Sequence, residues 1–250
     1  MKLSVSKRIC LWSGPRNIST ALMYSFAQRS DTKVYDEPLY AYYLSHTEAD
    51  EYHPGADKVL ASQENDGDKV IAMMLSADEK PVLFFKNMAH HLLDLDRSFM
   101  KETINVILTR DPVDMLPSFA KVIEHPTIDD VGYKLQADLA DELHRRQWPL
   151  VVLEARAILM DPKIELTRLC HAADISFDES MLQWTAGPRP EDGIWSEYWY
   201  DSVHRSTGFG QYQPKNSPFP DRLKPLLNKC LPYYAQLREL GEKSRQPDRS

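Results

Sequence analysis

Five short apolar runs, separated by longer stretches of helical periodicity, constrain the fold of this chain more than any other feature. The runs are Ile9–Trp12, Lys33–Asp36, Val82–Lys86, Ile104–Thr109 and Leu150–Leu153. Short runs rich in Val, Ile and Leu are typical of parallel strands that are covered on both faces. Strands that alternate with helices predict an α/β fold of three layers, α/β/α, with a central, mostly parallel sheet.

Apolar residues recur at helical spacing in three later segments. Steps of three and four predict one helix with a single apolar face, formed by Ile128, Val131, Leu135, Leu139 and Leu143. A second helix is expected to open at Asp161-Pro162, because proline suits the first helical position. Its inward residues would be Ile164, Leu166, Leu169 and Cys170. A third helix is predicted over 223–237, with an interruption near Pro232.

Composition narrows the class of protein. A chain of 250 residues without a repeat or a low-complexity linker favours a single domain spanning residues 1–250. No apolar run approaches the ~20 residues of a membrane span, and the first residues lack the apolar core of a secretory signal. Three scattered cysteines favour a reducing, cytoplasmic setting. The net charge of −7 argues against nucleic acid as the main partner, and a homo-oligomer is compatible with the sequence.

The strongest local signal follows the first predicted strand. A tight turn there leads directly into an apolar helical segment, through Gly14, Pro15, Arg16, Asn17, Ile18, Ser19 and Thr20. Unpaired backbone N–H groups at a helix N-terminus and the helix dipole both favour an anion. Arg16 adds a fixed positive charge with forked donors. The segment therefore predicts a cradle for a phosphate or sulfate group.

A second cationic turn follows the strand Ile104–Thr109. Arg110 leaves the predicted sheet at its carboxyl end, and Ser118 lies two turns into the helix that comes next. An arginine and a hydroxyl at this spacing are able to converge on one phosphate. The simpler interpretation is an Arg–Asp pair that caps a helix. Because ligands of such sheets bind beyond the carboxyl ends of the strands, both turns are expected on one edge.

These two motifs resemble those of the sulfotransferases that use 3′-phosphoadenosine 5′-phosphosulfate (PAPS). Pro15-Arg16-x-x-Ser19-Thr20 is similar to their 5′-phosphosulfate loop, although Asn17-Ile18 replaces the usual Ser-Gly. The segment from Arg110 to Ser118 resembles the R-D-P-x-D-x-x-x-S pattern that binds the 3′-phosphate. The resemblance covers roughly residues 7–180 and implies a P-loop-like sulfotransferase fold, PAPS as co-substrate and no metal.

Transfer to a hydroxyl needs a base near the acceptor. Glu37-Pro38-Leu39 looks like the segment of carbohydrate sulfotransferases whose glutamate deprotonates the acceptor, which implies Glu37. Cytosolic members carry Lys-x-His after the third strand, with histidine as base. Here Lys86 is in place but the histidines come four and five residues later, so we expect Glu37 as base, Lys86 as electrostatic helper and His90 as the substitute. Arg16 would stabilise the charge that grows on the leaving group.

Residues 185–219 form an irregular, aromatic segment with several prolines. A long loop of this kind predicts a lid or binding segment, and a packed surface cluster is the equally simple alternative. Arg205 and Gly208 lie where sulfotransferases carry a late Arg-Lys-Gly nucleotide clamp, which implies that Arg205 binds the cofactor.

The predicted function is transfer of a sulfuryl group from PAPS to a hydroxyl of a small-molecule or carbohydrate acceptor. A P-loop kinase or NTPase is an alternative, although Ile18-Ser19 stands where that motif needs Gly-Lys. A non-catalytic nucleotide-binding module is the other alternative, because Asn17-Ile18 alters the anion loop. The identity of the acceptor is left open by the sequence.

Overall fold

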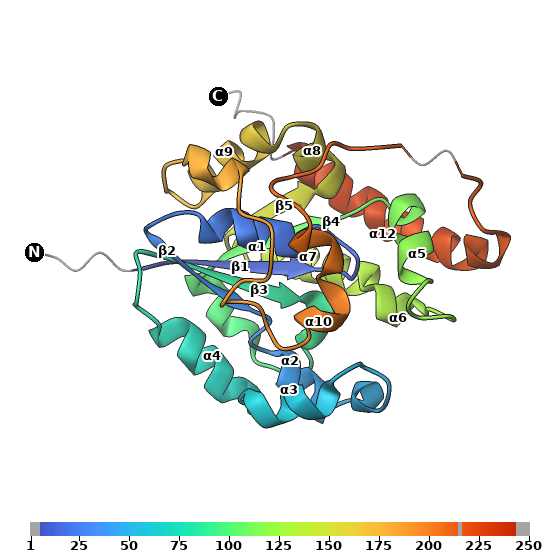
Figure 1. Cartoon of the computed structure of the whole chain (residues 1–250), viewed down its shortest axis with the longest axis horizontal. Helices are drawn as coiled ribbons and strands as arrows, with labels where there is room; N and C mark the ends of the chain where they lie inside the picture. Colours follow the sequence, from blue (N-terminus) through green and yellow to red (C-terminus); the bar gives the residue numbers. More distant parts are fainter. Residues whose placement is uncertain (1–5, 215–216, 244–250) are drawn as a thin grey trace, which may run out of the picture.

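A computed structural model describes residues 6–214 and 217–243 and places a five-stranded parallel sheet at the centre of the protein (Figure 1). The strands are β1 Lys7–Ser13, β2 Thr32–Asp36, β3 Val82–Met88, β4 Ile104–Thr109 and β5 Leu150–Glu154. Their order is β2-β3-β1-β4-β5, and every neighbouring pair is parallel. The predicted sheet is therefore confirmed, and its strands extend at most two residues beyond the predicted runs.

Helices cover both faces of the sheet, which confirms the three-layer α/β/α fold. The α-helices are α1 Ser19–Ala27, α2 Tyr40–Ser45, α3 Ala56–Ser62, α4 Gly67–Ser76, α5 Pro112–Phe119, α6 Ile128–Val131, α7 Tyr133–Arg145, α8 Ala155–Met160, α9 Pro162–Ala172, α10 Ser196–Trp199, α11 Asp201–His204 and α12 Lys224–Lys243. Short 3₁₀ turns lie at Glu48–Glu51, Ala89–His91, Arg97–Glu102, Glu179–Leu182 and Asp221–Leu223.

Alternation along β1 explains why the strands read as continuous apolar runs. Ile9 and Leu11 pack into a core with α1, α8 and α9, whereas Cys10 and Trp12 pack into a second core with α4, α7 and α12. All four side chains are fully buried. A parallel strand between two helical layers is apolar on both faces for this reason.

The helix predictions need three corrections. The single helix over 128–143 is two helices, because Gly132 takes a left-handed conformation (φ 72°) between α6 and α7. Ile164 is 62% exposed, since the apolar side chains with which α9 faces the core are Leu166, Leu169 and Cys170. Pro232 does not interrupt α12, which runs unbroken from Lys224 to Lys243. Packing of its apolar face against α5, α7 and β5 offsets the hydrogen bond that proline removes.

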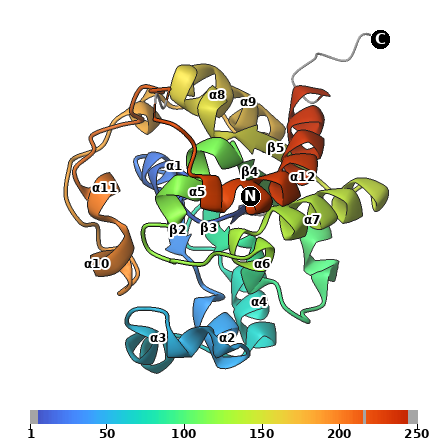
Figure 2. The ribbon, with the colours of Figure 1, turned by 90° about the vertical axis from the view of Figure 1, so that its right-hand side faces the viewer.

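The carboxyl ends of the strands bring distant residues to one edge of the sheet. Asp36 at the end of β2 lies beside Lys86 of β3, and Ser13 at the end of β1 lies beside Leu108 of β4. Figure 2 faces this edge, which α5, α6, α10 and α11 surround. The anion loop, Glu37, Lys86 and Arg110 therefore meet where open α/β sheets bind ligands.

The described part of the aromatic segment, 185–214 and 217–219, is irregular apart from α10 and α11. An isolated antiparallel bridge joins its Gly208 to Gln183, which precedes the segment. Its side chains Trp195 and Tyr200 are 2% and 5% exposed and pack with Tyr40 and Leu44 of α2. The segment is therefore anchored by a core of its own against α2 and α3, at the edge where the anion loop lies.

Candidate active site

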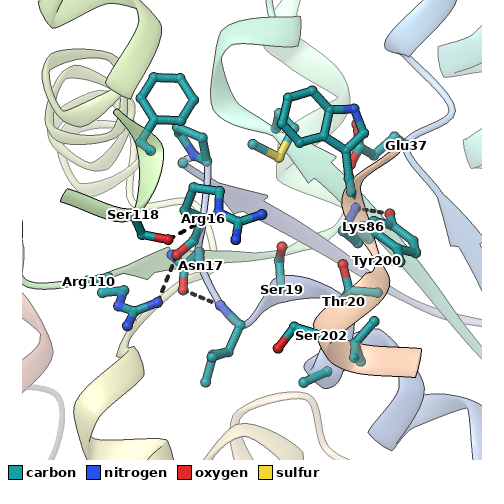
Figure 3. A pocket seen from close by; sticks show the side chains of 18 of the residues that line it. Arg16, Asn17, Ser19, Thr20, Glu37, Lys86, Arg110, Ser118, Tyr200 and Ser202 are labelled. Carbon is teal, nitrogen blue, oxygen red and sulfur yellow. Dashed lines mark hydrogen bonds and ion pairs between the residues drawn. The ribbon is translucent and has the colours of Figure 1, made fainter. Parts of the chain in front are cut away.

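A cavity of about 480 Å³ opens at the carboxyl edge of the sheet. Its walls include nearly every residue that the sequence singled out: Gly14, Pro15, Arg16, Asn17, Ile18, Ser19, Thr20, Glu37, Lys86, His90, Arg110 and Ser118. In Figure 3 the two arginines and Ser118 gather on one side of this cavity, whereas Glu37, Lys86 and Tyr200 lie on the other. The cavity thus has a cationic end and a carboxylate end.

The cationic end is held together by hydrogen bonds between the two predicted motifs. Arg110 Nη1 donates to the backbone carbonyl of Arg16 at 2.8 Å, and Arg16 Nε donates to Ser118 Oγ at 3.3 Å. Arg16 has a φ of 50°, a left-handed conformation that costs about 1 kcal/mol or more in a residue other than glycine. The fold holds this residue in a strained turn, and its guanidinium reaches the helix that carries Ser118.

Neither arginine of this end has an acidic partner among the described residues. Burial, followed by the nearby positive charge of Arg110, lowers the pKa of Arg16. The first turn of α1 adds to this charge, because its N-cap makes no side-chain hydrogen bond and its leading N–H groups have no intrahelical acceptor. Two half-buried cations beside an uncapped helix N-terminus form a site that favours an anion.

The residues that replace Ser-Gly in the loop are anchored to the sheet. Asn17 Nδ2 donates to the carbonyl of Leu108 at 2.7 Å, and Asn17 Oδ1 accepts the N–H of Ile18 at 2.7 Å. The amide of Ile18 is thereby satisfied within the loop, which leaves the N–H groups of α1 itself for a ligand. Gly14 lets the loop approach α6, because a Cβ there would lie 3.0 Å from the carbonyl of Val131.

The carboxylate end is a buried ion cluster around Lys86, which is 1% exposed. Lys86 Nζ donates to Asp36 at 2.9 Å, to Tyr200 Oη at 2.7 Å and to Glu37. Burial alone would lower the pKa of Lys86, but the charges of Asp36 and Glu37 raise it well above its usual value. Lys86 therefore stays protonated, and these three partners engage its three protons.

Glu37 is the carboxylate of this cluster that lines the cavity. Its φ of 45° is again left-handed, and its N–H donates to the carbonyl of Lys86 at 2.7 Å. Burial raises the pKa of Glu37, the Lys86 ammonium opposes that shift, and the charge of Asp36 adds to it. A carboxylate with a raised pKa beside a cavity is a suitable proton acceptor.

Tyr200 and Asp36 complete the cluster. Tyr200 Oη donates to Asp36, with both carboxylate oxygens at 2.8 Å, and the N–H of Gly193 donates to Asp36 at 3.0 Å. Burial and then the charge of Asp36 raise the pKa of Tyr200, so its hydroxyl stays protonated. Sequence reasoning missed this contact, because Tyr200 and Asp36 are separated by 164 residues and only the aromatic content of the segment marked it.

His90 and His91 lie in the 3₁₀ turn Ala89–His91 and line the same cavity as Glu37. Burial lowers the pKa of His90 to about 4 and that of His91 well below its usual value. The Nδ1 atoms of both rings are buried without a hydrogen-bond partner among the described residues. Both imidazoles are therefore neutral near pH 7, and His90 is a much weaker base than a free imidazole.

Arg205 does not reach the cavity. It is exposed and pairs with Asp201 at 2.8 Å, one turn earlier along α11. The short helix turns this side chain outward, whereas its neighbours Ser206, Gly208 and Phe209 line the cavity. The structure thus brings together every predicted site residue except this one.

Comparison with known proteins agrees with this geometry. The model of the sulfotransferase domain family matches residues 7–240. The chain belongs to this family. Two solved structures share its fold, the sulfotransferase domain of the Synechococcus PCC 7002 olefin synthase (TM-score 0.54, 14% identity, 99% of this chain and 98% of that one) and the sulfotransferase domain of the curacin biosynthetic pathway (TM-score 0.53, 13% identity, 91% and 98%).

Two curated proteins of Arabidopsis thaliana are closer to this sulfotransferase domain in sequence. The branched-chain-amino-acid aminotransferase-like protein 2 is 40% identical over 230 residues, and protein 1 is 41% identical over 231 residues. Each match covers 91% of this chain but only 40% and 41% of the relative, so the chain spans about two fifths of their length.

Across residues 6–214 and 217–243, no helix combines the length and the apolar character that crossing a bilayer requires.

Proposed function

We propose that this sulfotransferase domain transfers a sulfuryl group from PAPS to a hydroxyl of a small-molecule or carbohydrate acceptor. One observation carries the proposal. Arg16 and Arg110, which have no acidic partner in the described residues, meet at the uncapped N-terminus of α1, while the Glu37 carboxylate lines the same cavity. A doubly anionic cofactor suits the first feature, and an acceptor hydroxyl that must lose a proton suits the second.

Within the cationic end of the cavity, we assign the two anionic groups of the nucleotide to different residues. We assign the 5′-phosphosulfate to Arg16, the hydroxyls of Ser19 and Thr20 and the first N–H groups of α1. We assign the 3′-phosphate to Arg110 and Ser118, which both contact Arg16, the first at its carbonyl and the second at its side chain. Adenosine 3′,5′-bisphosphate, the product nucleotide, would keep both sets of contacts.

The chemical step needs no further group. The acceptor oxygen bonds to sulfur while the bond from sulfur to the bridging oxygen breaks, and that electron pair leaves with adenosine 3′,5′-bisphosphate. The proton of the acceptor passes to Glu37. Arg16 and the α1 N–H groups stabilise charge on the bridging oxygen, and removal of one such donor typically costs roughly 100- to 1000-fold in rate.

Lys86 takes a different role from the one expected of a helper at the leaving group. Its three protons are engaged by Asp36, Glu37 and Tyr200, so it acts by holding Glu37 in place and ionised. His90 stays the alternative base, although burial lowers its pKa to about 4. We also propose a cytoplasmic location, which the three free, buried cysteines support.

Calorimetry tests the proposal directly. We expect adenosine 3′,5′-bisphosphate to bind more tightly than ATP with magnesium, and PAPS to be consumed in the presence of an acceptor. Tighter binding and turnover of ATP would favour a P-loop kinase instead. Binding of the bisphosphate without any transfer would favour the alternative that the altered Asn17-Ile18 loop suggests, a non-catalytic nucleotide-binding module.

A further inference from the structure

A cluster of aromatic rings adjoins Glu37 on the side of the cavity away from the arginines. We call it the aromatic pocket, and its members are Tyr40, Tyr43, Tyr52, His53, His90, His91, Trp195 and Trp199, all of which line the cavity. The rings form a continuous chain. Tyr40 stacks on His91 and meets Trp195 edge-on, with 5.1 Å between the ring centroids in each pair. The ring centroid of Tyr43 lies 4.9 Å from those of both His90 and His91. The ring centroid of His53 lies 5.0 Å from that of Tyr52 and 6.4 Å from that of Trp199.

The pocket adjoins the reacting groups. Tyr40 lies three residues after Glu37 in the sequence, and its N–H donates to the Glu37 carbonyl at 3.0 Å. The charges of Glu37 and Lys86 both act on the Tyr40 hydroxyl, whose pKa is raised chiefly by burial. An acceptor whose hydroxyl reaches Glu37 would therefore place the rest of its structure against these rings.

The charge of this pocket is negative. Besides Glu37, the acidic side chain that lines the cavity within the described residues is Asp130. Its Oδ2 accepts the N–H and the hydroxyl of Thr127 at 2.7 Å each, and within residues 6–214 and 217–243 it forms no ion pair. Burial keeps His53 and His90 neutral near pH 7, and the Asp130 carboxylate offsets only part of that shift.

Among the described residues that line the cavity, no cationic side chain is left to balance Asp130. The cationic side chains that line the cavity in the described chain are Arg16, Arg110 and Lys86. The first two form the cationic end, and Lys86 is bonded to Asp36 and Glu37. If all three members of that ion cluster are ionised, it carries one net negative charge. An anionic acceptor would thus meet repulsion at this end of the cavity, whereas a cation would be attracted by both the carboxylate and the ring faces.

From this arrangement we infer that the acceptor is an alcohol bearing a positively charged ammonium group, which the aromatic pocket and Asp130 bind while its hydroxyl faces Glu37. The inference rests on the proposed function. Ring faces attract an ammonium group electrostatically, most strongly where water is excluded. The Nδ1 of His90 has no partner among the described residues, and in the tautomer that carries the proton on Nε2 it accepts an N–H of a protonated amine.

Two alcohols of nearly equal shape test the charge preference. They are 2-(trimethylammonio)ethanol and 3,3-dimethylbutan-1-ol, which differ by the replacement of N⁺ with carbon. Each is titrated calorimetrically into the chain loaded with adenosine 3′,5′-bisphosphate, so the readout is binding and needs no turnover. We expect the ammonium alcohol to bind about tenfold more tightly than its neutral partner.

Asp130→Asn removes the charge and keeps an oxygen for the N–H of Thr127. We expect it to reduce the preference for the ammonium alcohol to about threefold or less. Asp129→Asn is the matched control, because Asp129 is an exposed acid on the same short helix and does not line the cavity. It should leave the preference unchanged.

Equal affinities for the two alcohols, or no detectable binding of the ammonium alcohol, would overturn the inference. A preference that survives Asp130→Asn would overturn the role of Asp130. Failure of adenosine 3′,5′-bisphosphate to bind in the first titration would instead count against the proposed function. The same pair of alcohols titrated into the nucleotide-free chain would then still measure the charge preference of the aromatic pocket.

Discussion

Arg110 donates a 2.8 Å hydrogen bond to the backbone carbonyl of Arg16, and Arg16 is itself in a left-handed conformation. Arg110 thus stabilises the strained turn that orients the side chain of Arg16. The two motifs that the sequence singled out separately, 94 residues apart, are a single structural unit. Loss of Arg110 is therefore expected to disturb the Arg16 turn as well.

This coupling predicts that Arg110→Ala weakens adenosine 3′,5′-bisphosphate far more than AMP. A hydrogen bond to a charged group is worth about 1.5–3 kcal/mol, so we expect a loss of roughly 10- to 100-fold for the bisphosphate. AMP lacks the 3′-phosphate, so its affinity should fall only by the amount that loosening of the Arg16 turn costs. Calorimetric titration of both nucleotides checks this. Equal losses for the two would contradict the assignment of Arg110 to the 3′-phosphate.

Glu37→Gln should abolish most turnover and spare the nucleotide. A general base contributes typically 100- to 10,000-fold in rate, and Glu37 lies outside the cationic end of the cavity. The measurements are PAPS consumption and the dissociation constant of adenosine 3′,5′-bisphosphate. His90→Asn is the comparison. If Glu37→Gln retains activity while His90→Asn loses it, the base is His90.

Lys86→Met should move the acidic limb of the rate profile to higher pH. The base acts as a carboxylate, so activity falls as pH drops through the pKa of Glu37, which burial raises and Lys86 lowers. Without the ammonium that pKa rises further. The variant also leaves Asp36 and Glu37 buried without their cation, which costs about 3–5 kcal/mol of stability, so the profile is measured at low temperature with denaturant unfolding beside it. An unshifted acidic limb would argue that Lys86 does not tune Glu37.

Tyr200→Phe should lower kcat and leave nucleotide affinity unchanged. The hydroxyl bonds to both Lys86 and Asp36, and its loss leaves a buried proton of Lys86 unpaired at a cost of about 1–3 kcal/mol in unfolding free energy. Tyr198→Phe is the matched control, since Tyr198 is 43% exposed on the same short helix region. If the two variants behave alike in kcat, Tyr200 is a packing residue and does not position the ion cluster.

The sheet and the anion loop could be predicted because both depend on local sequence. Apolar runs fix the strands, and the carboxyl ends of parallel strands meet at one edge wherever the strands are ordered. The contact of Tyr200 with Asp36 and the approach of Asp130 to the histidines depend instead on how a long irregular segment and a short helix pack, which no local pattern encodes. Arg205 shows the same limit, because its direction is set by one turn of helix.

The histidines predict a pH dependence of stability. The folded-state pKa of His90 is lowered to about 4 from an ordinary 6.5, so the stability that its neutral form contributes is fully present above pH 6.5 and is lost as pH falls toward 4. Each pKa unit corresponds to about 1.4 kcal/mol, which gives a loss on the order of 3 kcal/mol at most. His90→Asn should make the unfolding free energy fall less steeply between pH 6.5 and 4, measured by denaturant titration, while His91, whose pKa burial also lowers, keeps part of the slope. The exposed His125→Asn is the control, and an acid limb that is as steep in His90→Asn as in the parent chain would assign the effect to other groups.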